Sequence, residues 1–212
     1  NNSATTATQI FNIDRGNPTF SVTSPTNGAL ISNSAAAAYV ISGACSEAGQ
    51  NVVFSGDVSG TIVCSGANTY SKALDFSGLA NGPVSIAINH ADAAGNAGAT
   101  INQTYTLDKL APSLAITSPA VNAYINIANK TAFTVSGSCG ENTRTVSFSG
   151  AAAGSTTCTT GNNPNYLATL DFSGQADGTV NLMAAHTDVA GNTATTNRDF
   201  TLDTILPTFT IT

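Results

Sequence analysis

Four cysteines occur at a spacing that repeats along the chain. Cys45 and Cys64 are 19 residues apart, and Cys139 and Cys158 have the same separation. Two pairs at one repeated spacing predict one disulfide in each of two repeated units, and therefore an oxidising compartment. Zinc binding is the alternative, but zinc sites favour cysteines about two to four residues apart or histidines close by. A disulfide that closes a loop of about 20 residues stabilises a small domain by about 3 kcal/mol.

Acidic residues also recur at matching positions, and their carboxylates are candidate ligands for calcium. Nine of the twelve occupy matching positions of the repeat, namely Asp14, Asp108, Asp203, Glu47, Glu141, Asp75, Asp171, Asp92 and Asp188. Calcium takes about six to eight oxygen ligands from carboxylates, amides and carbonyls. The hypothesis is an interdomain Ca²⁺ site at each junction: one set is Asp108, Glu141, Asp188 and Asn192, and the equivalent earlier set is Asp14, Glu47, Asp92 and Asn96.

The alternative for the same residues is a role in turns. Aspartate and asparagine side chains bond the local backbone, and glycine adopts positive φ without steric cost. Arg15 and Lys109 directly follow two of the repeated aspartates and would neutralise them. On this interpretation no cofactor is required.

No arrangement of residues predicts catalysis. His90 and His186 hold matching positions, but neither belongs to a motif with a cysteine or serine, so each is expected to be a packed residue at a strand end. The chain contains no G-x-S-x-G, CxxC, phosphate-binding loop or dinucleotide fingerprint. We therefore do not expect an enzyme.

Composition excludes two classes of partner. Only 8% of the residues are charged and the net charge is −6, which argues against nucleic acid and anionic membranes because both require basic patches. No apolar run approaches the roughly 20 residues of a membrane helix, so we expect no membrane insertion.

The segments that carry the cysteines and the acidic residues form a tandem repeat. The segment DAAGN at 92–96 returns as DVAGN at 188–192, and YTLDKLAP at 105–112 returns as FTLDTILP at 200–207. Aligning the copies predicts two modules, at 14–107 and 108–202. Residues 1–13 align with the last strand of a preceding repeat, and residues 203–212 with the first strand of a following one.

Within each module the apolar pattern is that of short strands. Val84, Ile86 and Ile88 alternate with polar or small residues, as in a half-buried antiparallel strand. About seven such runs per module predict an all-β chain of two tandem immunoglobulin-like, seven-stranded antiparallel β-sandwiches. The chain lacks tryptophan, and its cysteines are closer in sequence than the inter-sheet pair of antibody domains. Counting strands up and down instead places each disulfide between neighbouring strand ends at one pole.

These motifs together resemble the bacterial immunoglobulin-like (Big-type) repeats of large surface adhesins. The resemblance rests on LDFSGLANG before a strand, the D-x-AGN turn and the closing TLD-x3-P, and it covers nearly the whole chain. It implies exported stalk or adhesin modules at the bacterial cell surface, joined in series to neighbouring repeats of the same chain. In some such arrays calcium makes the junctions rigid.

The function that we expect is a structural spacer in a bacterial adhesin or fibre. The alternative is a module that itself binds a glycan or protein of a host or prey surface through loops at one pole. The segment from Cys158 to Tyr166, which contains GNNPN, is two residues longer than the matching segment from Cys64 to Tyr70. Loops carry binding residues more often than the strands they connect, so specificity is expected there.

Overall fold

The computed structural model describes residues 8–211. The chain divides into two compact units: the first holds the described residues up to Ile31 and Ala35–Asp108, and the second holds Ser32–Ser34 and the described residues from Lys109 on. Of the proposed strand remnants, residues 1–7 and 212 lie outside the described residues. Residues 8–13 and 203–211 do not belong to a strand. Each unit is described below by itself.

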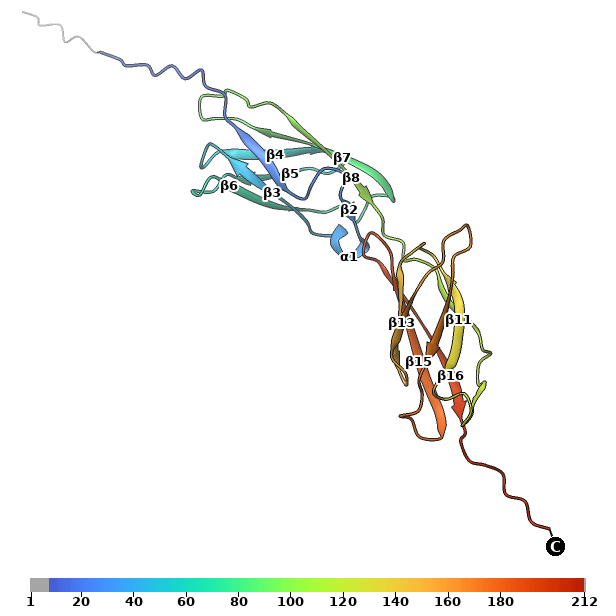
Figure 1. The fold of residues 1–212 in the computed structure, drawn as a ribbon. Helices are drawn as coiled ribbons and strands as arrows, with labels where there is room; N and C mark the ends of the chain where they lie inside the picture. Colours follow the sequence, from blue (N-terminus) through green and yellow to red (C-terminus); the bar gives the residue numbers. More distant parts are fainter. Residues whose placement is uncertain (1–7, 212) are drawn as a thin grey trace, which may run out of the picture. The chain divides into compact units, whose positions relative to one another are not determined.

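Both units are built almost entirely of strands (Figure 1). The first contains β1 (Phe20–Ser24), β2 (Leu30–Ile31), β3 (Tyr39–Cys45), β4 (Asn51–Gly56), β5 (Gly60–Val63), β6 (Thr69–Leu74), β7 (Gly82–His90) and β8 (Ile101–Leu107), and the short α1 (Asn33–Ala36) lies between β2 and β3 in sequence. The second contains β9 (Leu114–Ser118), β10 (Tyr124–Ile125), β11 (Phe133–Cys139), β12 (Thr145–Gly150), β13 (Gly154–Thr157), β14 (Asn165–Leu170), β15 (Gly178–Thr187) and β16 (Thr193–Leu202).

Each unit is a sandwich of a three-stranded and a five-stranded sheet. In the first the orders are β1-β3-β6 and β2-β8-β7-β4-β5, and in the second β9-β11-β14 and β10-β16-β15-β12-β13. Val84, Ile86 and Ile88 are buried along β7, so the predicted two-residue period is confirmed. The immunoglobulin-like sandwich is confirmed in both modules.

The strand count of seven per module is wrong, because a two-residue strand was not predicted. After β1 the chain crosses to the other sheet, where β2 pairs in parallel with β8 at Leu30 and Ile31. The crossing is held by Asn27, whose side-chain oxygen accepts from the Thr104 N–H at 2.7 Å. Gly28 follows with φ of 85° and donates its N–H to the Thr104 carbonyl at 2.8 Å. Two residues are too short for an alternating pattern to appear in the sequence.

Both expected cysteine pairs are disulfide-bonded in the structure. Cys45 is the last residue of β3, in the three-stranded sheet, whereas Cys64 directly follows β5, at the edge of the five-stranded sheet. The bond therefore joins the ends of two strands, and these strands belong to different sheets, which was not predicted from the sequence. Cys139 and Cys158 hold the same places in the second module.

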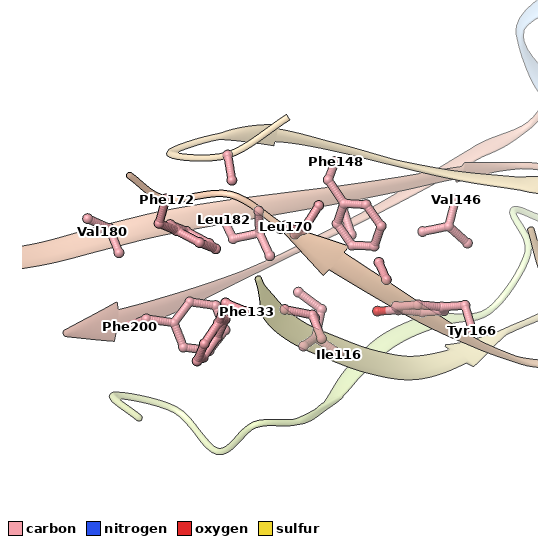
Figure 2. Packing of buried hydrophobic residues seen from close by; sticks show 14 of the residues in the cluster. Ile116, Phe133, Val146, Phe148, Tyr166, Leu170, Phe172, Val180, Leu182 and Phe200 are labelled. Carbon is pink, nitrogen blue, oxygen red and sulfur yellow. The ribbon is translucent and has the colours of Figure 1, made fainter. Parts of the chain in front are cut away.

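A group of three aromatic rings fills part of the second core (Figure 2). Phe133, Phe172 and Phe200 meet edge to face, with ring centroids 5.2–6.3 Å apart. Such pairs add about 0.5–1.5 kcal/mol to the stabilisation from burial alone. The rings come from β11, the segment after β14, and β16, so they tie the two sheets together.

The matching positions of the first core are Tyr39, Phe76 and Tyr105. The Tyr105 side chain is 1% exposed, and its hydroxyl has no hydrogen-bond partner among the described residues. The hydroxyl of Tyr70, by contrast, donates to the Ser21 carbonyl at 2.9 Å. Burial raises the pKa of both phenols to about 12, so both hydroxyls stay protonated at neutral pH.

This contrast predicts opposite effects for one chemical change. Tyr105→Phe should raise the free energy of unfolding of the first module by about 1 kcal/mol, because it removes a buried, unsatisfied hydroxyl. Tyr70→Phe should lower it by about 0.5–1.5 kcal/mol, because it removes a hydrogen bond. Urea denaturation of the two variants and the parent chain measures both changes. Equal losses in the two variants would contradict the assignment of Tyr105.

Candidate functional site

The most polar buried site of the second module is the turn between β15 and β16. The side chain of Asp188 is 2% exposed and that of Asn192 is 7% exposed. The Asp188 carboxylate accepts from the Asn192 backbone N–H at 2.8 Å and, through its other oxygen, from the Asn192 side-chain N–H at 2.9 Å. Gly191, with φ of 98°, completes the turn. The D-x-AGN motif therefore encodes a turn in which a carboxylate bonds its own loop.

The first module repeats this turn with one additional contact. The Asp92 carboxylate accepts from the backbone N–H of Asn96 at 2.8 Å and from its side chain at 2.7 Å. The same side-chain nitrogen donates to the backbone carbonyl of Asp14 at 3.3 Å. Asn96 thus connects the turn to the segment that enters the module.

Hydrogen bonding keeps both buried carboxylates ionised. At Asp188 burial acts to raise the pKa, but the hydrogen bonds from Asn192 and from the backbone N–H groups of Ala190 and Gly191 outweigh it and lower the pKa. At Asp92 the side-chain bond from Asn96 is the largest influence and lowers the pKa against the effect of burial. These carboxylates carry charge within a shell of local donors.

Two arginines of the second module have structural roles that were not predicted from the sequence. Arg144 donates to the backbone carbonyl of Asp188 at 2.8 Å and to that of Thr187 at 3.3 Å, so it holds the turn from outside. Arg198 on β16 donates to the carbonyls of Ile116 and Pro119, near β9. Neither lies in a motif, and the matching residues of the first module, Gln50 and Gln103, are uncharged.

The histidines are packed at strand ends, as predicted. His90 and His186 are each 1% exposed. The Nδ1 atom of His90 lies 3.0 Å from the Asn51 carbonyl, and that of His186 lies 3.0 Å from the Thr145 carbonyl. The His90 ring also meets Phe20 edge to face at 5.9 Å. These contacts orient each ring within its own sandwich.

The proposed calcium ligands are only partly brought together. In the first module Asp92, Asn96 and the Asp14 carbonyl meet, whereas the Glu47 carboxylate accepts only from the neighbouring Ser46 hydroxyl, at 3.5 Å, among the described residues. Asp108 belongs to the first unit, while Glu141, Asp188 and Asn192 belong to the second. Within residues 8–211, no three His, Cys, Asp or Glu side chains form a group that could hold a metal ion. The geometry of the site supports the turn interpretation, and the interdomain calcium site is the alternative to it.

Comparison with known proteins gives matches at the level of structure. No protein-family model and no curated protein matches the sequence. Within the described part of the chain, no helix is long and apolar enough to cross a membrane.

Three similar structures illustrate the range of matches. Fibronectin(III)-like modules of Clostridium thermocellum CbhA match with a TM-score of 0.50 at 14% identity, over 88% of this chain and 94% of theirs. A Ca²⁺-stabilised adhesin with which an Antarctic bacterium binds ice matches with a TM-score of 0.49 at 23% identity, over 90% of this chain and 49% of its own.

A tetra-tandem repeat from the extending region of a large adhesion protein matches with a TM-score of 0.39 at 21% identity, over 89% of this chain and 49% of its own. The chain thus spans about half the length of the two adhesin structures. The match to the fibronectin(III)-like modules supports the sandwich fold expected from the sequence.

Acid should destabilise the second module through Asp188. Its pKa is lower in the folded state than the ordinary value of about 3.9, so its contribution is complete above that value and is lost as the pH falls through the folded pKa. Asp188→Asn should lower stability at neutral pH by about 1.5–3 kcal/mol and flatten the acid limb of the stability curve. Urea denaturation between about pH 2 and 7 measures this. Glu141→Gln, the same change of charge in the same module, is the matched control.

Calcium should leave the melting temperature unchanged relative to chelator. Both oxygens of the Asp92 and Asp188 carboxylates are already bonded within their own turns, so a cation would have to displace those donors. Differential scanning calorimetry at about 1 mM calcium and in chelator measures this, since a ligand that binds the native state raises its melting temperature. A rise of several degrees that Asp108→Ala reduces would establish the junction site instead.

Proposed function

We propose that the chain is part of a stalk, and that its modules are structural spacers in a bacterial cell-surface adhesin or fibre. The observation that carries this is the repetition of one disulfide-bonded sandwich, with the same sheet order in both copies and a very short connection between them. The first module's last strand ends at Leu107 and the second module's first strand begins at Leu114. The connection contains Pro112, whose ring fixes φ.

The chemistry of the modules supports a spacer. Their buried polar side chains serve turns and strand ends, and the similar structures are structural and adhesin domains rather than enzymes. Two disulfides and a surface of uncharged polar residues suit an extracellular location. The partners of each module are then the neighbouring repeats of the same protein, and the proposal places this chain among large bacterial adhesins.

A stalk must gain length with each repeat. Chains of two, four and six modules, made by joining copies at the repeat boundary, should show a maximum dimension in small-angle X-ray scattering that grows in proportion to module number. The control replaces residues 108–113 with glycine and serine, which makes the connection a flexible coil whose reach grows roughly as a square root. If the native series grows no faster than the flexible series, the stalk function is wrong.

A further inference from the structure

The second module carries a polar groove at one end of its three-stranded sheet. Its volume is about 440 Å³, within the range of about 300–1,000 Å³ usual for small-molecule sites. The polar side chains that line it are Ser113, Thr117, Ser138, Asn162, Asn163 and Asn165. Strands β9, β11 and β14 provide the floor, and the loop before β14 forms a wall. All of these residues belong to one unit.

The loop that forms the wall is held in place from several sides. The Asn165 N–H donates to the Thr159 hydroxyl at 3.0 Å, and the Cys139 N–H donates to the Pro164 carbonyl at 3.1 Å. The side-chain amide of Asn142, in the orientation that satisfies it, donates to the carbonyls of Thr159 and Gly161 at 3.1 Å each. A loop ordered in advance loses less entropy when a ligand binds.

Two sequence differences between the modules coincide at this groove. The loop is the segment that is two residues longer than its counterpart in the first module. Gly140 also replaces Ser46, whose hydroxyl in the first module accepts from the Thr19 N–H at 3.0 Å. A Cβ atom at Gly140 would lie only 2.6 Å from the Ser113 nitrogen. The glycine therefore lets the Ser113 backbone approach more closely than a side chain at this position would allow.

The groove offers hydrogen bonds that the protein itself does not use. Among the described residues, the side chains of Ser113, Ser138, Asn162 and Asn163 have no recorded hydrogen-bond partner, and all four are exposed. Each asparagine amide supplies two donors and a carbonyl acceptor, and each hydroxyl both donates and accepts. These groups therefore remain available to a ligand that also alternates donors and acceptors.

We infer that this groove binds a neutral carbohydrate. No charged side chain is among its described lining residues, so an ionic ligand would find no counter-charge. A purely apolar ligand would leave the asparagine and serine groups unpaired, which is unfavourable. Neighbouring sugar hydroxyls match the amide groups of Asn162 and Asn163, and the Pro164 ring gives an apolar patch for sugar C–H groups. This site is independent of the spacer role.

Titration with sugars tests the assignment. The ¹⁵N-labelled two-module chain is titrated with neutral methyl glycosides of glucose, mannose, galactose and N-acetylglucosamine, and with sialic acid as a charged comparison. The expected result is saturable shifts of the backbone amides at 113, 138, 140, 162, 163 and 165 with at least one neutral glycoside, at millimolar affinity. Absence of saturable shifts up to about 50 mM, binding of sialic acid alone, or shifts elsewhere would overturn it.

Two variants of the loop and one control variant complete the test. Replacing both Asn162 and Asn163 with alanine should weaken binding about tenfold or more, the effect of losing about 1.4 kcal/mol of hydrogen bonding. Asn197→Ala, an exposed asparagine on β16 of the same module, should bind as the parent does. A second variant exchanges residues 159–165 for residues 65–69, a connection that folds in the first module. It should keep a dispersed spectrum and lose binding, and retained binding in either loop variant would refute the site.

Discussion

Each module depends on pressing the inner faces of two small sheets against each other. A three-stranded sheet has little stability alone, and the described chain offers no helix longer than four residues to cover it. Aliphatic and aromatic side chains fill the space between the sheets, and the disulfide joins the sheets near one end. The turns and polar contacts described above fit this arrangement, because each brings the chain from one sheet to the other or closes an end of the sandwich.

The two modules differ in how completely their buried polar groups are hydrogen-bonded. In the described residues, three buried polar atoms lack a hydrogen-bond partner: His90 Nε2, Gln103 Oε1 and the Tyr105 hydroxyl. All three belong to the first module. The second has Phe200 in place of Tyr105 and Arg198 in place of Gln103, and the arginine bonds two carbonyls near β9. Since each unsatisfied buried group costs about 1–3 kcal/mol, these three atoms lower the stability of the first module.

Much of this architecture is predictable from the sequence, because the information is local or repeated. Alternation along Val84, Ile86 and Ile88 predicts a strand, and the repeated spacing of Cys45 and Cys64 predicts a disulfide. The partners of Asp92 and Asp188 also follow from D-x-AGN, since the donors lie within four residues. By contrast, β2 is too short to leave a periodic pattern. The longer loop at 161–165 is visible in the sequence as a candidate binding segment, but the groove also needs Gly140 and Ser113, which are distant from that loop in sequence, so no local pattern could reveal the complete site.

The disulfides have a mechanical consequence. When a tandem protein is pulled from its ends, the force passes along the backbone, and a covalent bridge carries it past the residues that the bridge encloses. In the first module the segment between Cys45 and Cys64 is excluded from extension even after the strands have separated. At about 3.4 Å per residue, roughly 65 Å of contour length is withheld from each opened module. A chain under load therefore lengthens in two restrained steps, and reduction of the bridges would release the remainder.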